Sequence, residues 1–255
     1  MIQSVSRALD ILTIVSDAKG KPIKLNAIAE KAGLNGSTCT HLVQTLCEKG
    51  FLSQVSRSAG YVLGAYPYYL TRYRTFHREL INTCNPALRW IQRRTGHTAL
   101  LAILVDAQKF VISYAEDGKD ILQERGDLYR GNLYNSATGR AMLSAMRHAD
   151  LVQLVQKIGL PTAQDWPGID SLETLKRNLR IIAASKIVCI ENTVNGKYDA
   201  IYGISIQGPR LNSAIGLHVR QDSPPTEEER SLYKEALLAG AKEINRRLRF
   251  EEDLL

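Results

Sequence analysis

Hydrophobic positions in residues 25–50 follow a helical period in two runs, which a short polar break separates. The first run stops at Gly33, a residue type that readily adopts the left-handed backbone of a helix C-terminus. The second run ends at Gly50, and residues 35–37 all supply side chains or backbone suited to its N-cap. The pattern therefore predicts a helix, a turn and a second helix.

The second of these helices has two unlike faces. Its apolar face consists of Leu42, Val43, Leu46 and Cys47. The opposite face carries small polar side chains, namely Ser37, Thr38, Thr40, His41, Gln44 and Thr45. A helix-turn-helix with such an outer face is typical of proteins that lay it in a DNA major groove. The same spacing also fits an ordinary helix pair in a small helical domain.

Further elements flank the helix pair on both sides. Residues 4–16 predict a helix with a buried stripe of Val5, Ala8, Leu9, Ile11, Leu12 and Val15. After the pair, β-prone runs at 51–55 and 61–64 enclose a polar loop, which predicts a hairpin. Three helices and a hairpin make a winged helix-turn-helix. Arg57 at the tip of the wing is then either a DNA contact or a solvated loop arginine.

The net charge of +7 is unevenly distributed along the chain. Residues 1–100 carry 13 Lys and Arg against 5 Asp and Glu, whereas residues 101–255 carry 20 against 21. The excess positive charge therefore accompanies the predicted helix-turn-helix, where DNA phosphates would need it. The sequence shows no membrane-spanning run and no signal peptide, so we expect a cytoplasmic protein.

The N-terminal motifs resemble those of the IclR family (isocitrate-lyase-regulator type) of bacterial transcriptional regulators. The resemblance rests on residues 5–12 (VSRALDIL), 33–38 (GLNGST), 42–46 (LVQTL) and 61–64 (YVLG). It implies a homodimer or tetramer that binds double-stranded DNA at a pseudo-palindromic operator. The chain departs from the family at Gly36 and His41, where the family usually has Lys or Arg. We therefore expect Gln44 and DNA shape to contribute more to base recognition.

Residues 66–84 keep an apolar stripe among several arginines, and we predict a linker helix that packs on its own or a partner's domain. Aromatic residues among arginines also fit stacking on single-stranded nucleic acid. The predicted organisation is therefore a DNA-binding domain at 1–65, a linker at 66–84 and a second domain at 85–255.

The second domain is predicted to be α+β. A helix begins at Asn85-Pro86, and strands are expected at 98–105, 110–116 and 121–124. Two helices follow near 149–158 and 171–184. Strands near 187–191, 199–206 and 213–219 then precede a final helix, which gives an antiparallel sheet of about six strands. This order is similar to the GAF/PAS-like effector-binding domain of the IclR family.

The segment 134–143 resembles the family's effector-pocket motif. Ser136 can cap a helix there, and the N–H groups at its start suit a carboxylate. The candidate effector-binding residues are Asn135, Ser136, Ala137, Thr138, Gly139, Glu191, Asp199, Tyr202 and His218. An ordinary capped helix and a satisfied sheet histidine are the alternatives. Groups of both signs indicate a hydroxy acid or sugar acid as the ligand.

We find no nucleophile elbow, P-loop, dinucleotide-binding or zinc-protease motif, and the four cysteines are scattered. We therefore expect no catalytic residues, no metal site and no cofactor. The leading interpretation is a DNA-binding regulator whose affinity for its operator depends on a small organic acid. In the alternative interpretation the second domain only assembles oligomers and binds no ligand.

Overall fold

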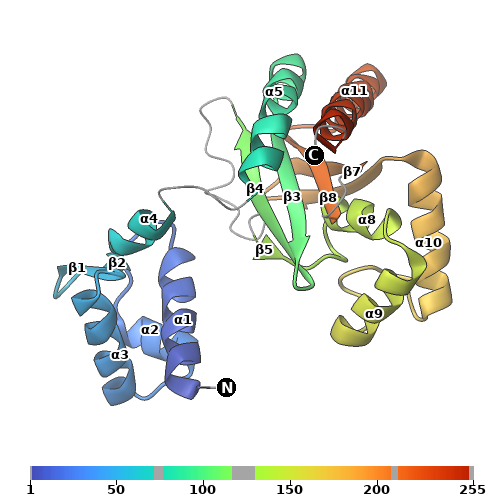
Figure 1. Ribbon diagram of the computed structural model, residues 1–255. Coiled ribbons are helices and arrows are strands. Elements are labelled where there is room, and N and C mark those ends of the chain that lie inside the picture. Colours follow the sequence, from blue (N-terminus) through green and yellow to red (C-terminus); the bar gives the residue numbers. More distant parts are fainter. Residues whose placement is uncertain (1, 72–76, 117–129, 208–211, 253–255) are drawn as a thin grey trace. The chain divides into compact units, whose positions relative to one another are not determined.

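The computed structural model describes residues 2–71, 77–116, 130–207 and 212–252. The chain forms two compact units, Met1–His77 and Arg78–Leu255 (Figure 1). The first unit is a helix-turn-helix with a wing, and the second is an antiparallel sheet with helices on both faces. The predicted fold class is therefore confirmed.

The first unit contains every element that the N-terminal pattern predicts. Its elements are α1 (Gln3–Ser16), α2 (Leu25–Ala32), α3 (Gly36–Glu48), β1 (Leu52–Ser56) and β2 (Gly60–Leu63). Gly33 ends α2 at a φ of 62°, in the left-handed region that glycine tolerates. Asn35 caps α3, because its side-chain oxygen accepts a 2.8 Å hydrogen bond from the N–H of Thr38. Local chemistry thus fixes the turn between the two helices.

The predicted buried stripe of α1 is wrong at two positions. Val5 and Leu9 are exposed, whereas Ile11 and Val15 are buried in the core of the first unit. Leu9 lies about 200° around the helix from Ile11, so one packed side cannot cover both. The sequence pattern also missed Cys39, whose side chain is fully buried on the inner side of α3.

The predicted linker falls across the boundary between the two units. A short helix, α4 (Tyr66–Thr71), belongs to the first unit, and α5 (Arg78–Thr95) begins the second. The rest of the predicted linker, residues 72–76, lies outside the described residues. Pro86 lies inside α5 and does not begin it. The side of α5 that carries Pro86 is exposed, so solvent can satisfy the carbonyl group that loses its helical hydrogen bond.

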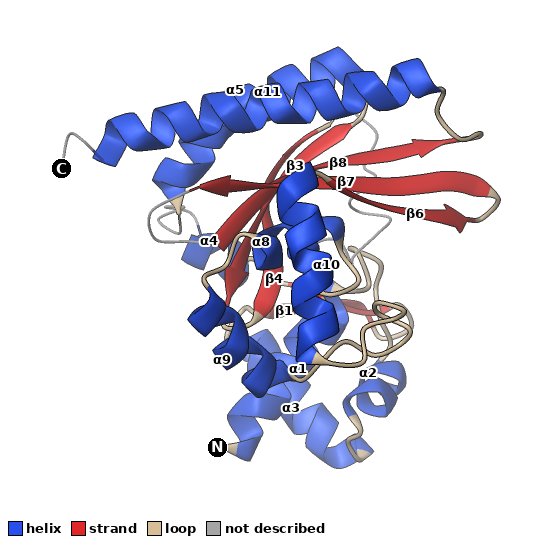
Figure 2. Cartoon of the chain, turned by 90° about the vertical axis from the view of Figure 1, so that its right-hand side faces the viewer, coloured by secondary structure: helices blue, strands red, loops and turns tan. Residues whose placement is uncertain are grey.

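The second unit is built on one antiparallel sheet (Figure 2). Its strands are β3 (Thr98–Val105), β4 (Gln108–Ala115), β5 (Arg130–Gly131), β6 (Val188–Val194), β7 (Lys197–Gln207) and β8 (Asn212–Gln221). Their order across the sheet is β5-β4-β3-β8-β7-β6. The predicted strand at 121–124 lies outside the described residues, and the short β5 was not predicted. Central β3 is buried along most of its length because helices cover both faces.

Different helices cover the two faces of the sheet (Figure 2). One face packs against α5 and α11 (Glu227–Glu252). The other packs against α8 (Ala137–Ser144), α9 (His148–Ile158) and α10 (Leu172–Ser185). We call these the α11 face and the α8 face. No helix in the described part of the chain is long and apolar enough to cross a membrane.

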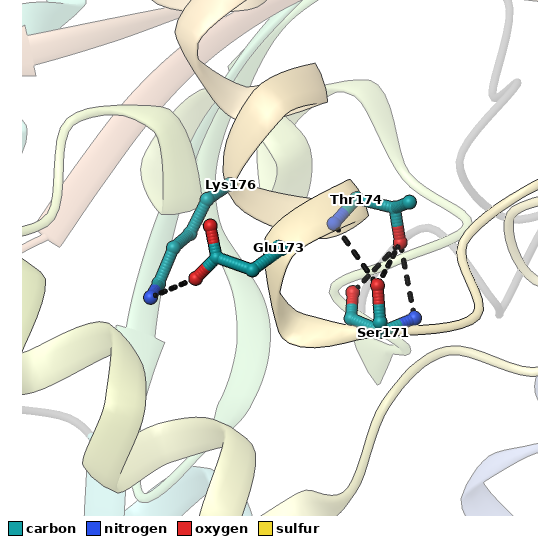
Figure 3. A network of polar contacts seen from close by, with 4 residues as sticks. All are labelled: Ser171, Glu173, Thr174 and Lys176. Carbon is teal, nitrogen blue, oxygen red and sulfur yellow. Dashed lines mark hydrogen bonds and ion pairs between the residues drawn. The ribbon is translucent and has the colours of Figure 1, made fainter.

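The start of α10 shows how sequence sets a helix boundary in this unit (Figure 3). The side chain of Ser171 accepts from the N–H of Thr174, and the Thr174 hydroxyl oxygen accepts from the N–H of Ser171 at 3.0 Å. This capping box satisfies two N–H groups that the helix itself cannot. Glu173 and Lys176 pair on the next turn at 2.7 Å. The helix therefore begins at Leu172, close to the predicted residue 171.

Candidate functional site

The outer face of α3 is polar and open to solvent. Five of its six predicted DNA-binding residues are exposed, namely Ser37, Thr40, His41, Gln44 and Thr45, whereas Thr38 is half-buried. Thr40 and Thr45 donate their hydroxyl groups to helix carbonyls four residues earlier, at 2.7 Å and 2.9 Å. These threonines therefore present mainly their methyl groups and second lone pairs outward. The face can meet a base edge without first breaking a packed interface.

The wing places Arg57 at its tip. Residues 57–59 form the turn between β1 and β2, and the Ser56 hydroxyl accepts a 3.0 Å hydrogen bond from the N–H of Ala59. Gly60 follows at a φ of 108°, and a Cβ there would lie 2.2 Å from the carbonyl oxygen of Ile23. The wing is thus held close to the segment before α2, with Arg57 exposed. A flexible cation at this place can reach a phosphate group.

The start of α8 is buried and closely packed on the sheet. Ser136 caps it by accepting from the N–H of Gly139 at 3.0 Å, as predicted. That N–H is therefore bonded to the cap, and the backbone nitrogen of Thr138 lies against the sheet, 2.8 Å from where a Cβ on Gly203 would be. A Cβ on Gly139 would lie 2.2 Å from the carbonyl oxygen of Leu133, so its small size serves backbone packing. Asn135 is exposed and lies just before the cap.

Two sheet glycines show which strand positions face α8. A Cβ on Gly203 would lie 2.6 Å from the backbone of Ala137, and one on Gly216 would lie 2.8 Å from the Thr138 methyl group. Alternate residues of a strand share a face, and the β7–β8 register runs without a shift. Asp199 on β7 and His218 on β8 therefore lie on the α8 face with these glycines.

Asp199 and His218 form a buried pair. The His218 Nε2 atom lies 3.3 Å from Asp199 Oδ2, and the two side chains are 0% and 2% exposed. Among the described residues, neither ring nitrogen of His218 makes a hydrogen bond. Burial of a polar group without a hydrogen bond is costly, so native structures usually keep such groups for a reason. The sequence predicted both residues as part of one site, and the structure brings them together.

Glu191 and Tyr202 lie on the α11 face, so the structure does not bring them together with the other predicted effector-binding residues. Tyr202 packs in the core with Tyr233 of α11, and the centroids of the two rings are 5.8 Å apart. Glu191 forms an ion pair with Arg230 of α11. Successive side chains of a strand point to opposite faces of the sheet. Tyr202 lies three residues from Asp199 on β7, so the two side chains are on opposite faces.

Glu191, Tyr202 and Arg230 form a second polar cluster, and the sequence pattern did not predict Arg230. Its guanidinium group holds the pKa of Glu191 below the usual range and lies 3.5 Å from the Tyr202 hydroxyl group. Burial raises the pKa of Tyr198 to about 12 and that of Cys189 to about 12, so both stay protonated at neutral pH. The position of Arg230 follows from how α11 packs on the sheet, which no local pattern reveals.

A cavity of about 480 Å³ lies elsewhere in the second unit. Its lining residues are Ala107, Gln108, Asn132, Leu133, Tyr134, Ile158, Leu160, Thr162 and Asp165. None of the predicted effector-binding residues lines it. Within the described ranges, no group of three or more His, Cys, Asp or Glu side chains is placed to hold a metal ion.

The fold and the exposed face of α3 define a winged helix-turn-helix DNA-binding domain joined to an α+β domain. Residues 4–56 match the model of the IclR helix-turn-helix domain. Two curated repressors are each 26% identical over 161 residues, which is 62% of this chain and 58% of theirs. They are the acetate operon repressor of Salmonella typhimurium LT2 and the transcriptional repressor IclR of Escherichia coli K12. Residues 4–56 thus carry an IclR-type helix-turn-helix domain, and the chain is similar to IclR-family repressors.

Longer matches cover the second unit as well. The HTH-type transcriptional regulator BhcR of Paracoccus denitrificans is 26% identical over 223 residues, or 82% of this chain and 78% of its own length. An IclR regulator structure from Alicyclobacillus acidocaldarius superposes with a TM-score of 0.74 at 20% identity, covering 96% of this chain and 98% of its own. An IclR homologue from Microbacterium hydrocarbonoxydans, complexed with 4-hydroxybenzoate, superposes with a TM-score of 0.71 at 18% identity. The match covers 97% of this chain and 99% of the homologue. These structures share the fold of both units.

Proposed function

We propose that the chain is a transcriptional regulator that binds double-stranded DNA through the outer face of α3 and the wing. The exposed row of small polar residues on α3 carries this proposal, because such residues reach base edges in a major groove. Arg57 adds a phosphate contact from the wing tip. We expect a two-fold dimer or a tetramer on a pseudo-palindromic operator, since paired domains read paired half-sites.

The second unit is proposed to bind a small organic acid on the α8 face. The positive end of the α8 dipole suits a carboxylate, and the buried Asp199–His218 pair suits a hydroxyl group. At the rise of a β-strand, His218 lies about 7 Å along β8 from Gly216, which contacts Thr138. That separation matches a ligand with an acid group at one end and a hydroxyl group at the other. The 4-hydroxybenzoate bound by a homologue has this chemistry.

Ligand binding is proposed to change the affinity for DNA by favouring one arrangement of the assembled DNA-binding domains. A ligand shifts such an equilibrium only when it binds the two arrangements with different affinity. The proposal therefore requires that a ligand hydroxyl group supply the hydrogen bonds that the ring of His218 lacks more readily in one arrangement than in the other.

A selection of genomic fragments from the organism's own DNA tests the DNA-binding half of the proposal. We expect the full chain to enrich fragments that share a pseudo-palindrome. The Arg57→Ala variant should bind the same fragments more weakly. The slope of its log binding constant against log salt concentration should be smaller in magnitude by about one. Enrichment that is indifferent to sequence would contradict the proposal.

Calorimetry tests the ligand half. Lactate, gluconate and 4-hydroxybenzoate are the probes, and the corresponding uncharged amides are the controls. We expect at least one acid to bind and its amide to bind at least tenfold more weakly. Binding of only apolar or uncharged compounds would contradict an organic-acid site.

The alternative function, in which the second unit only assembles oligomers, is favoured by one observation. Asp199 and His218 are closed to solvent, and the start of α8 packs directly on Gly203 and Gly216. A side-chain-filled face of this kind can serve packing alone. The calorimetry decides between the two functions, because a packing-only face binds none of the acids.

A further inference from the structure

Gln44 and Glu48 lie one turn apart on the exposed face of α3. The side-chain nitrogen Nε2 of Gln44 is 3.2 Å from Glu48 Oε1. Both residues are exposed, and Glu48 is the only acidic residue in α3. A carboxylate at the end of a helix that is proposed to face DNA is unfavourable for phosphate binding. Its presence there therefore calls for a reason.

The chemistry of the two side chains fixes how the Gln44 amide points. An ionised carboxylate only accepts hydrogen bonds, so the amide must turn its NH₂ group toward Glu48. The amide oxygen Oε1 then points away from Glu48, along the outer face of the helix. The opposite orientation would place two acceptors together and lose a charge-assisted hydrogen bond.

This orientation distinguishes the two purines. Adenine presents a donor (N6) and an acceptor (N7) in the major groove, whereas guanine presents two acceptors (O6 and N7). With its NH₂ group held by Glu48, Gln44 can accept from N6 through Oε1 and donate its second N–H to N7. Against guanine, Oε1 would face O6 with no hydrogen between them.

We infer that Glu48 is a specificity-determining positioning residue, which orients Gln44 so that α3 selects adenine and rejects guanine at the base pair Gln44 meets. This inference rests on the proposed binding of DNA through α3. Glu48 itself touches no base in this account and acts only through Gln44. The cost is a negative charge near the phosphates, which lowers the affinity for every sequence equally.

The test uses the full chain, randomised duplexes and sequencing of the selected pool, followed by anisotropy titrations of single-base variants. The position read by Gln44 is the one at which the Gln44→Ala variant loses its preference. There, wild type should prefer adenine over guanine by about tenfold. In Glu48→Gln the new amide can accept or donate, so the Gln44 amide can turn and the preference should fall to about threefold or less.

Glu30→Gln is the matched control, because Glu30 is another exposed acid of the same domain, on α2. It removes the same charge and should raise overall affinity without changing the adenine-to-guanine ratio. An unchanged ratio in Glu48→Gln overturns the inference, and so does a Gln44→Ala variant with wild-type preferences at every position. A wild-type chain that selects no sequence at all overturns the proposed function, and this inference with it.

Discussion

The two faces of the sheet in the second unit carry polar clusters of opposite character. On the α11 face, Glu191 and Arg230 are partly exposed and pair with each other. On the α8 face, Asp199 and His218 are closed to solvent, and the ring of His218 makes no hydrogen bond within the described residues. The sheet thus has a partly exposed ion pair on one face and, on the other, a buried pair whose imidazole makes no hydrogen bond within the described residues.

The difference shows how similar residue types acquire different roles. A partly exposed ion pair contributes little to stability, because water solvates the charges almost as well as the partner does. A buried imidazole that makes no hydrogen bond within the described residues leaves capacity for another group. On the α8 face, the ring of His218 therefore offers hydrogen bonds that a ligand could complete.

The largest expected difference between the faces is in the cost of removing a carboxylate. Asp199→Ala should lower the free energy of unfolding by about 3 kcal/mol, since it leaves a buried imidazole without its partner. Glu191→Ala should lower it by less than about 1 kcal/mol. Urea denaturation followed by circular dichroism measures both. Equal losses would show that the two clusters do not differ as described.

A smaller effect is expected from filling the contact between α8 and the sheet. Gly203→Ala adds a Cβ 2.6 Å from the Ala137 backbone, and we expect a loss of about 2 kcal/mol. Gly216→Ala should cost less, because its new Cβ meets the end of the Thr138 side chain. Thermal unfolding of the two variants provides the comparison. If Gly216→Ala were the more damaging, the position of α8 over β7 would be incorrect.

The smallest effect concerns pH and the α11 face. Burial lowers the pKa of His97, whose Nε2 atom lies 3.0 Å from the Tyr233 hydroxyl. The folded state therefore binds a proton less readily than the unfolded state. Stability should be complete above the unfolded pKa of about 6.5 and fall below it, by at most about 1.4 kcal/mol per pH unit.

Melting curves between pH 5 and 8 check this dependence on His97. His97→Gln should flatten the fall below pH 6.5, whereas His148→Gln, at an exposed site on α9, should leave it unchanged. If the loss of stability below pH 6.5 is as large in His97→Gln as in wild type, another group causes it.

The sequence was sufficient for the elements and for part of the site. Gly33 and Asn35 fixed the turn of the helix-turn-helix through local backbone chemistry, and Ser136 capped α8 as expected. The strands β3, β4, β6, β7 and β8 of the second unit followed from hydrophobic runs. Features of this kind are local, so a single sequence reveals them.

The remaining features depend on contacts between distant segments. Val5 and Leu9 are apolar yet exposed, since only one side of α1 meets α2 and α3. Glu191 and Tyr202 were grouped with Asp199 because the family resemblance pointed to Glu191 and to residues 196–203, although strand alternation places them on the opposite face. The contact between Arg230 and Glu191 joins residues 39 positions apart, and no local pattern predicts it.

The central claim is that the α8 face couples an organic acid to DNA binding and the α11 face does not. Anisotropy titrations of a selected DNA fragment, with and without lactate, gluconate and 4-hydroxybenzoate, test it most directly. At least one acid should change the Kd for DNA by fivefold or more in wild type and in Glu191→Gln, but by less than twofold in Asp199→Asn. The claim is contradicted if no acid changes the wild-type Kd, or if Asp199→Asn responds as wild type does.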